Sequence, residues 1–544
     1  MGIPSYFSYI VKNHSDIVKK LKDINKKINN LYLDSNSIIY DCFYSIQKAE
    51  QTQAEQTQAE QTQAEQTQAE QTQAEHNPIN KTQFETKLIK SIIQKIKEYI
   101  KIVKPTGTVM IAFDGVAPSA KLKQQRNRRY KSALEKILKK DDTVGWDKTA
   151  ITPGTEFMEK LGKRINRHFQ KNKNIIVSDS SEPGEGEHKI FQYIRDNEDR
   201  HKNEVTMIYG LDADLIMLCL NHLPVSKEIY LFRETPDFIR SLNADLEPNS
   251  NYFLDIPELA KHIILEMNGQ KEPDSIQEKN RLYDYIFLCF FLGNDFMPHF
   301  PSIPIRHGGI HILKSAYYNI LGRSNKNLTN GKEIYWGNLK KFIQYISSNE
   351  HDRIIEEYKT NQKLERRHKK YEKMIDKLND IPTKIRDNEK FIDPYSPYWE
   401  QRYYKTLFDL DISDFYRKKI CLNFLTGLEW NMKYYTSGCP DWDWKYEYNY
   451  PPLLNDLVKY IPGWEVSLIK ENDNGPIPQL AQLCYVLPKS SLDLIPNKIR
   501  EEVKEEFNYS MDFDIEWSFC RYFWEGHVKL PEIDMEKLID IVEN

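Results

Sequence analysis

Short apolar runs alternate with longer amphipathic stretches along the first half of the chain. The runs most typical of β-strands are residues 31–33, 108–113, 174–177 and 205–209. Strands separated by helical stretches favour an α/β fold with a mostly parallel central sheet flanked by helices. Because ligands bind such sheets at the carboxyl ends of the strands, the residues that follow each run are the first candidates for function.

The pattern changes twice in the second half. Residues 349–390 are dense in Lys, Glu, Arg and Asp and poor in apolar positions, which predicts exposed helices that form a connector. From about residue 395 the chain is rich in aromatic side chains, which indicates a second, mostly helical region packed on the first. We therefore predict a first region at 1–345, a charged helical connector at 346–394 and a second region at 395–544.

A repeat interrupts the first region. Residues 51–75 are five copies of QTQAE, and this period matches neither a coiled-coil heptad nor a solenoid. The segment has no large apolar residue with which to form a core. We expect a low-complexity insertion, mobile or weakly helical, with no catalytic role.

Composition narrows the class of protein. The 544 residues are 40% apolar, which argues against a disordered chain, and the seven Cys form no CxxC pair, which argues against a disulfide scaffold or a closed zinc site. The longest apolar run, 285–292, is short of the ~20 residues of a membrane helix. The N-terminus fits neither a secretory signal nor a myristoylation motif. We expect an intracellular protein, in the cytoplasm rather than the nucleus, since the basic residues 366–370 fit a solvated helix face.

The formal charge of −4 alone would disfavour a nucleic-acid partner, but it does not show where the charges lie. Acidic residues follow several predicted strands. They are Asp34 and Asp114, each directly after a run, Asp212 and Asp214 after residues 205–209, Glu185 and Glu187 in PGEGEH, and Asp295 after residues 286–292. Clustered carboxylates bind hard cations such as Mg²⁺. Two such ions ~3.5–4 Å apart can activate a water and stabilise the leaving oxygen in phosphodiester hydrolysis. Turn and helix-cap roles are the alternative for each residue, and spacing alone leaves both open.

A basic segment follows Asp114. Six cations and no acid lie between residues 121 and 131. Lys121, Gln125, Arg128 and Arg129 fall at i, i+4, i+7 and i+8, on one helical face. Arg and Lys side chains in this arrangement suit a terminal phosphate, with a solvated basic face as the alternative.

Several long motifs together resemble the XRN family of 5′→3′ exoribonucleases. In the first region these are MGIPSYFSYI, LYLDSNSIIYDC, IAFDGVAPSAKLKQQRNRRY, ITPGTEFM, EPGEGEHKIFQYIR, YGLDADLIML and FFLGNDFMPHFPSI. In the second region they are GLEWNMKYYTSGCPDWDWKYEYNYPPLLNDL, PIPQLAQLCYVLP and RYFWEGHVKLPEID. The resemblance covers nearly the whole chain apart from the repeat and the connector.

The resemblance implies a PIN/FEN-like nuclease core and processive 5′→3′ degradation of single-stranded RNA that bears a 5′-monophosphate, with release of nucleoside 5′-monophosphates. It assigns the seven acidic residues to divalent metal, two Mg²⁺ for which Mn²⁺ can substitute. It assigns Lys121, Gln125, Arg128 and Arg129 to the 5′-phosphate. The expected partner is RNA, bound by a monomer and not at a membrane.

Base stacking is a further implication, at ~1–3 kcal/mol per base. Family members commonly have a stacking His six residues beyond the first acid, where this chain has Tyr40, which can stack but cannot carry the charge of His. The family also has a stacking Trp in the stretch that contains Trp442 and Trp444. Which of the two stacks on RNA, and whether either is a core residue, stays open.

We expect a short member of the family, limited to its catalytic core, without the zinc-knuckle cysteines and the C-terminal extension of larger members. A FEN-like, structure-specific DNA nuclease is one alternative, since the fold and the first three residues fit both. An inactive RNA-binding scaffold is the other, disfavoured because all seven acids are retained. Abundant Asn, Ile and Lys are typical of AT-rich genomes and fit a viral protein in a host cytoplasm.

Overall fold

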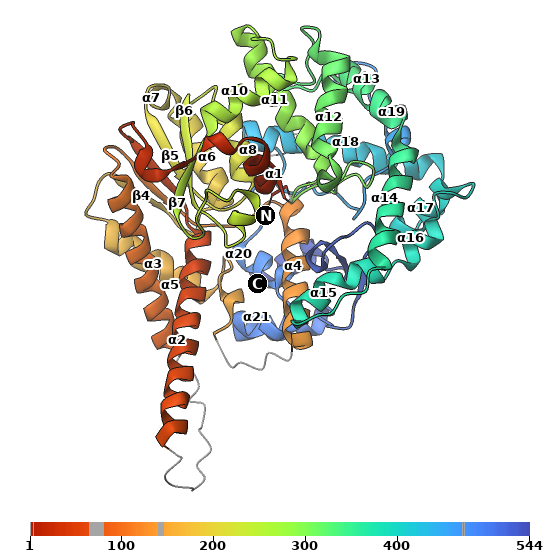
Figure 1. Ribbon diagram of the computed structural model, residues 1–544. Coiled ribbons are helices and arrows are strands. Elements are labelled where there is room, and N and C mark those ends of the chain that lie inside the picture. Colours follow the sequence, from red (N-terminus) through yellow and green to blue (C-terminus); the bar gives the residue numbers. More distant parts are fainter. Residues whose placement is uncertain (1, 4, 65–80, 140–145, 471, 473) are drawn as a thin grey trace.

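The structure is a computed structural model that describes the chain apart from residues 1, 4, 65–80, 140–145, 471 and 473. A twisted sheet with helices on both faces forms one side of the molecule, and an assembly of helices forms the other (Figure 1). Helix α4 (Ser119–Lys139) lies between them. None of the described helices is long and apolar enough to cross a membrane.

The central sheet is mostly parallel. In the described part of the chain its strand order is β1-β7-β6-β5-β2-β3-β4. The strands are β1 (Val18–Lys20), β2 (Asn30–Asp34), β3 (Val109–Ala112), β4 (Ile175–Ser178), β5 (Val205–Tyr209), β6 (Glu228–Glu234) and β7 (Asn251–Asp255). Strands β2 to β6 pair in parallel, whereas β7 pairs antiparallel with both β6 and β1.

Alternate residues of each strand point to opposite faces of the sheet, so one strand supplies two cores. In β2, Leu31 and Leu33 belong to one apolar cluster and Tyr32 belongs to the other. The first cluster includes α2 (Asn36–Ala64), α3 (Lys81–Val103) and α5 (Glu156–Phe169). The second includes α1 (Tyr6–Asn13), α6 (Gly186–Asp196), α8 (Asp214–His222) and α10 (Ile256–Met267). The strands are buried on both faces because helices cover both.

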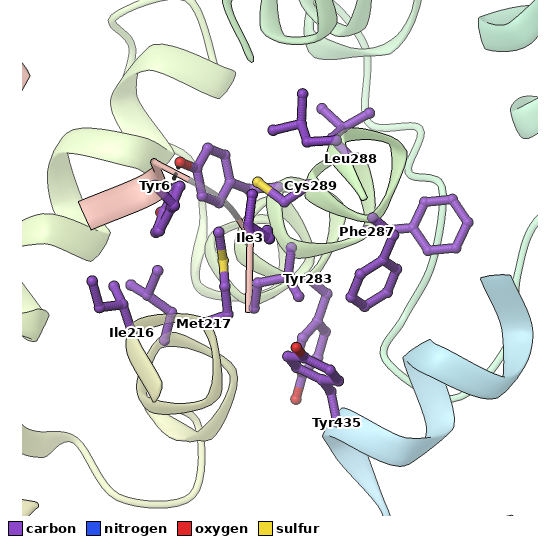
Figure 2. Packing of buried hydrophobic residues seen from close by; sticks show 14 of the residues in the cluster. Ile3, Tyr6, Ile216, Met217, Tyr283, Phe287, Leu288, Cys289 and Tyr435 are labelled. Atoms are coloured by element: carbon purple, nitrogen blue, oxygen red, sulfur yellow. Dashed lines mark hydrogen bonds between the residues drawn. The ribbon is translucent and has the colours of Figure 1, made fainter. Parts of the chain in front are cut away.

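The helical region shares its core with the sheet region. The cluster that holds Tyr32 continues into α11 (Ser275–Cys289), α13 (Trp336–Ser347), α18 (Asp414–Thr436) and α19 (Leu454–Tyr460). Figure 2 shows Ile3 and Tyr6 of the N-terminal segment against the side chain of Cys289, with Tyr435 of α18 on the far side of α11. The hydroxyls of Tyr6 and Tyr285 lie 2.9 Å apart. The two regions are therefore joined by continuous apolar packing.

The remaining elements complete both sides. They are α7 (Glu198–His201), α9 (Ile239–Leu242), α12 (Gly309–Tyr317), α14 (Glu350–Glu365), α15 (Met374–Lys384), α16 (Asp387–Ile392), α17 (Trp399–Phe408), α20 (Gln479–Val486), α21 (Asn497–Glu506), α22 (Met535–Glu543) and a hairpin of β8 (Asp514–Glu516) and β9 (His527–Lys529). Helix α20 and strand β9 pack against α4.

Part of the repeat is helical. Residues 51–64 continue α2, whose far end projects beyond α3 and away from the body of the molecule (Figure 1). Outside the repeat, Glu50 of α2 pairs with Lys87 of α3 at 2.8 Å. The rest of the repeat, 65–75, lies outside the described residues, and its lack of a catalytic role stays a prediction.

The predicted fold class, a mostly parallel α/β sheet with an aromatic-rich helical region packed on it, is confirmed. The four strand-like runs correspond to β2, β3, β4 and β5. Strands β1, β6 and β7 were not predicted; β7 pairs antiparallel with β6 and β1, and β1 is the edge strand. The residue boundaries of the three predicted regions stay a prediction.

Candidate metal and phosphate sites

Carboxylates gather at one edge of the sheet because neighbouring parallel strands end there. Asp34 is the last residue of β2, and Asp114 follows β3 by two residues. Asp212 and Asp214 follow β5, and Asp214 is the first residue of α8. Strand β2 leads to α2 on one face, whereas its neighbour β5 leads to α8 on the other. This reversal opens a crevice at the carboxyl edge of the sheet.

Helix α6 brings two more carboxylates to this edge. Glu185 precedes the helix and Glu187 lies in its first turn. The backbone N–H of Gly186 donates to Asp114 at 2.8 Å, and a Cβ on Gly186 would lie 2.8 Å from an oxygen of Asp34, so only glycine fits there. Lys189 donates to the carbonyl of Phe113 at 2.8 Å and holds α6 against the loop after β3.

Two overlapping sets of ligand atoms result. Oxygens of Asp34, Asp114 and Glu187 all lie within 4.8 Å of one another. A second set within the same limit is Glu185, Glu187 and His188. Glu187 belongs to both sets, so this edge of the sheet offers two adjacent positions for a cation.

The other three predicted ligands, Asp212, Asp214 and Asp295, lie close enough to these carboxylates for their charges to interact. The charges of Asp114, Asp212 and Asp214 add to burial in raising the pKa of Asp34 well above its usual value. Burial, together with the charges of Asp212 and Asp295, raises the pKa of Asp214 to about 6. All seven predicted metal ligands therefore form one group, which we call the acidic cluster: Asp34, Asp114, Glu185, Glu187, Asp212, Asp214 and Asp295.

Lys121 of α4 brings a positive charge to the acidic cluster. Its Nζ lies 2.6 Å from Glu185 and 2.5 Å from Asp295. Burial opposes the charge on Lys121, but the carboxylates of Asp295 and Glu185 outweigh it and raise the lysine pKa well above its usual value. In turn Lys121 holds the pKa of Asp295 below its usual value despite burial.

The acidic cluster fits a hard divalent cation. One lysine cannot balance seven carboxylates, and burial with mutual repulsion still raises the pKa of Glu187 well above its usual value. One oxygen each of Asp34 and Asp214 is buried without a hydrogen-bond partner among the described residues. Buried carboxylate oxygens without donors, next to like charges, are the ligands that Mg²⁺ or a similar ion prefers.

The N-terminal segment closes one side of the acidic cluster. Gly2 has a φ of +53° and approaches Asp214 so closely that a Cβ would lie 2.6 Å from the Asp214 nitrogen. A larger residue at position 2 would displace α8 or the N-terminal segment.

A cavity of about 490 Å³ lies beside α4, further along the helix from the acidic cluster. Arg128, Arg129 and Tyr40 line it, together with the loop at 147–152 and residues 488–491. Arg129 donates to the hydroxyl of Thr152 at 2.9 Å, and burial and the charge of Arg128 lower the pKa of Arg129 to about 10. Arg128 is exposed. We call this site the phosphate cavity, because two guanidinium groups facing one space suit a phosphate.

The four residues predicted for the 5′-phosphate are divided between two sites. Arg128 and Arg129 line the phosphate cavity, whereas Lys121 contacts Glu185 and Asp295 of the acidic cluster. Gln125 is buried between them on α4, and its side-chain oxygen has no hydrogen-bond partner among the described residues. Their assignment to phosphate stays a prediction.

The two candidate tryptophans differ in their packing. The ring of Trp444 stacks on that of Trp430 at 5.2 Å, and Trp430 is fully buried. Both side chains are half-buried, but Trp442 has no ring contact among the described residues, and its backbone carbonyl accepts a hydrogen bond from the Ser119 N–H at the start of α4. The ring of Trp442 therefore has fewer packing contacts than that of Trp444, and which of the two stacks on RNA stays a prediction.

Two residues of the site were missed by sequence reasoning. His188 packs its ring on Tyr434, with centroids 3.8 Å apart, and Tyr434 donates to Glu185 at 3.0 Å. His188 could have been predicted as a member of the site, because it follows Glu187 directly in the first turn of a helix. No sequence signal indicates that Tyr434 of α18 reaches this site.

Two family models match the chain. The model described as "XRN 5'-3' exonuclease N-terminus" matches residues 1–69 and 62–235, and that described as "Xrn1 helical domain" matches 276–396 and 394–544. Among curated proteins, 5'-3' exoribonuclease 2 of Arabidopsis thaliana is 26% identical over 94% of this chain and 62% of its own length. The exoribonuclease 1 proteins of Homo sapiens and Saccharomyces cerevisiae are 25% and 26% identical over all of this chain and 34% and 43% of theirs. The chain thus spans about three fifths or less of these relatives.

Proposed function

Because this chain belongs to the XRN family of 5′→3′ exoribonucleases, we propose that it is itself a metal-dependent enzyme that hydrolyses single-stranded RNA from a 5′-monophosphate. The observation that carries the proposal is the position of the acidic cluster next to the phosphate cavity along one helix. Lys121 of α4 contacts the cluster, and Arg128 and Arg129 line the cavity two turns further on. A 5′-phosphate held by the two arginines leaves the next phosphodiester at the carboxylates, so only the terminal nucleotide is cut.

The acidic cluster would hold two Mg²⁺ ions, with Mn²⁺ as a substitute. Asp34, Asp114 and Glu187 offer one set of ligands, and Glu185, Glu187 and His188 offer the adjacent set. Divalent cations supply charge neutralisation for the phosphate and a water of lowered pKa. The protein positions the ligands, keeps them buried and uses Lys121 to neutralise Glu185 and Asp295.

Positive charge in the phosphate cavity favours a 5′-phosphate over a 5′-hydroxyl. Four cations line the cavity: Arg128, Arg129, Lys136 and Lys148. Lys136 pairs with Asp147 at 3.5 Å, and the remaining positive charges attract the roughly −1.5 to −2 of a phosphate monoester. A 5′-hydroxyl offers nothing for them to bind. Asp147 also lines the phosphate cavity, where it accepts hydrogen bonds from Ser491 at 2.7 Å and the Thr149 N–H at 3.0 Å. Its carboxylate opposes the added charge of a 5′-triphosphate.

Each cut restores the feature that the phosphate cavity binds. Hydrolysis that leaves the phosphate on the 5′ end of the shortened RNA generates a new 5′-monophosphate, so the same strand can advance by one nucleotide. Tyr40 in the phosphate cavity and the half-buried Trp442 offer rings on which bases of a single strand can stack. This arrangement supports processive release of nucleoside 5′-monophosphates.

We also propose that the enzyme acts as a monomer in the cytoplasm. All seven cysteines carry free thiols, which fits a reducing compartment.

A panel of four substrates tests the proposed specificity. The protein is incubated with Mg²⁺ and the same RNA sequence carrying a 5′-monophosphate, a 5′-triphosphate or a 5′-hydroxyl, and with a flap DNA. We expect rapid loss of the 5′-monophosphate RNA and slow loss of the other three. Preferential cleavage of the flap DNA would instead identify a structure-specific DNA nuclease, and no cleavage of any substrate would identify a binding scaffold.

A further inference from the structure

A second cavity, of about 430 Å³, adjoins α4 on a different face from the phosphate cavity. We call it the aromatic chamber; its walls are α4 and residues 292–306, 446–450 and 519–527. Asn127 and Lys131 of α4 line only this chamber, whereas Arg129 and Lys136 line only the phosphate cavity. Arg128 and Ser132 line both, so the two spaces adjoin at this part of α4.

The aromatic chamber also reaches the acidic cluster. Asp295 lines it, and so does Gln124, whose side-chain N–H donates to Asp295 at 3.3 Å. Trp442, a candidate ring for stacking on incoming RNA, is not among the lining residues. The chamber is therefore next to the carboxylates and separate from this ring.

Three cations, Lys123, Arg128 and Lys131, line the α4 wall of the chamber, together with one acid, Glu135. Arg128 is exposed and has no ion pair among the described residues. Lys123 donates to the carbonyl of Glu447 at 3.0 Å, and Lys131 donates to the carbonyl of Gly526 at 2.7 Å, so each ammonium is held in place. On the opposite wall Arg306 is already paired with Glu525. The unpaired positive charge thus lies on the α4 side, where an anion would bind.

The rim of the chamber carries an aromatic platform. Trp524 lines the chamber with 40% of its surface exposed, and its ring stacks on Tyr522 at 5.9 Å with an interplanar angle of 15°. The guanidinium groups of Arg306 and Arg521 lie 5.4 and 5.5 Å from the centre of the Tyr522 ring. A flat exposed ring supported by a second ring and by cations is suited to stack on a nucleobase.

We propose that the aromatic chamber binds a nucleoside 5′-monophosphate, the product released from the acidic cluster, with its phosphate at Arg128 and its base on Trp524. The identity of the ligand as product rests on the proposed function. The volume lies within the ~300–1,000 Å³ of small-molecule sites, which suits one nucleotide better than a strand. Because Arg128 lines both spaces, the product phosphate can move from the phosphate cavity to the aromatic chamber while it stays next to the same cation. The phosphate cavity is then free for the next 5′ end.

Equilibrium binding of radiolabelled AMP in EDTA tests the site without catalysis. The measurements use an Arg129→Ala protein, because this change weakens the phosphate cavity and leaves the aromatic chamber intact. In that background we expect one AMP per chain, about tenfold weaker binding after Trp524→Ala, and substantial recovery with Trp524→Phe. Trp464→Ala is the matched control, since Trp464 is 73% exposed and lies outside the chamber lining; it should leave the affinity unchanged.

A kinetic measurement separates the chamber from the proposed function. In protein with Arg129 intact, Trp524→Ala should raise the inhibition constant of added AMP about tenfold and leave single-turnover removal of the first nucleotide unchanged. If AMP binding does not depend on Trp524 but the protein degrades RNA, the proposed product site is wrong and the proposed function stands. If AMP binding does depend on Trp524 but the protein degrades no RNA, the proposed function is wrong and the nucleotide site stands. Weaker binding of an RNA strand but not of AMP after Trp524→Ala would show that the chamber takes the strand and would also overturn the proposal.

Discussion

At the sheet edge, the order and direction of the strands determine where the functional side chains lie. In the helical region, the positions of the candidate side chains depend instead on how individual rings pack. Asp34 and Asp114 lie near the ends of adjacent parallel strands, so both reach the same edge of the sheet, whereas an antiparallel pairing would place them at opposite edges. In the helical region, Trp442 and Trp444 are two residues apart, yet one ring stacks on Trp430 and the other makes no ring contact among the described residues.

The two regions also differ in which groups they bury. The sheet edge buries like charges, and burial and repulsion raise the pKa values of Asp34, Glu187 and Asp214. The helical region buries apolar rings, and Trp430, which is fully buried, donates its indole N–H to the carbonyl of Asp441 at 2.8 Å. The sheet edge is thus locally destabilised for function, while the helical region stabilises the fold around it.

The largest expected effect is at the sheet edge. Asp34→Asn removes one charged ligand from the acidic cluster and should lower the rate of RNA cleavage roughly 10³-fold, since electrostatic groups of active sites contribute on this scale. Because it also removes buried like-charge repulsion, the melting temperature in EDTA should stay the same or rise. Single-turnover cleavage and thermal unfolding measure the two effects.

Asp255→Asn is the matched control. Asp255 also ends a strand, but β7 runs antiparallel, so its end lies at the opposite edge of the sheet, where Asp255 caps α10. Asn is a good cap, and activity should be unchanged. Equal losses of activity in the two variants would contradict the role of strand direction.

Much of the sheet edge could be predicted from the sequence. Asp34, Asp114, Asp212 and Asp214 follow apolar runs that do form strands, and the strand ends bring them together. The contact of Lys121 with the acidic cluster could not be predicted, because helical periodicity gives the face of a residue but not the direction in which a long side chain extends. Strands β6 and β7 were missed although residues 229–232 and 252–254 are apolar, because runs this short also occur in buried helices and periodicity alone does not distinguish the two.

The next effect concerns the phosphate cavity. Arg129→Ala should reduce the preference for 5′-monophosphate over 5′-hydroxyl RNA by about 10- to 100-fold, because a charge-assisted hydrogen bond contributes about 1.5–3 kcal/mol. The ratio of kcat/KM for the two RNAs is the measurement. Lys139→Ala, on the same helix but outside the cavity lining, should keep the full preference. An unchanged ratio of kcat/KM in Arg129→Ala would show that the phosphate cavity does not recognise the 5′-phosphate.

A smaller effect separates the two tryptophans of the helical region. Trp442→Ala should weaken binding of a single-stranded RNA about five- to tenfold with little change in stability. Trp444→Ala should instead lower the free energy of unfolding by about 2–4 kcal/mol, since it removes a ring that packs on Trp430. RNA binding and urea denaturation of both variants measure the contrast, and the opposite pattern would exchange their roles.

The smallest effect is a pH dependence of stability. Acidic groups whose folded pKa is raised stabilise the fold below their usual pKa near 4, and this contribution is lost as the pH rises through the folded value, about 6 for Asp214. In EDTA the melting temperature should therefore fall between pH 5 and 7. Mg²⁺ should restore about 2–5 °C at pH 7.5 and less at pH 5.

Asp284 provides the control for that measurement. Burial raises the pKa of Asp284 to about 7. Asp284 lies away from the acidic cluster and accepts hydrogen bonds from the backbone N–H groups of Leu328 and Thr329, both at 2.9 Å. Asp284→Asn should change the melting temperature in EDTA and leave the increment from Mg²⁺ intact. A Mg²⁺ increment that is the same at pH 5 and pH 7.5 would argue against carboxylate ligands of raised pKa.

We propose above that the protein, with metal bound at the acidic cluster, removes single nucleotides from a 5′-monophosphate end. One time course measures this activity. A single-stranded RNA with a labelled 5′-monophosphate is incubated with the protein in Mg²⁺ or in EDTA, and the products are separated by length. We expect labelled mononucleotide to be the first and only labelled product in Mg²⁺, and we expect EDTA to abolish its release. Labelled fragments longer than one nucleotide, or undiminished cleavage in EDTA, would contradict it.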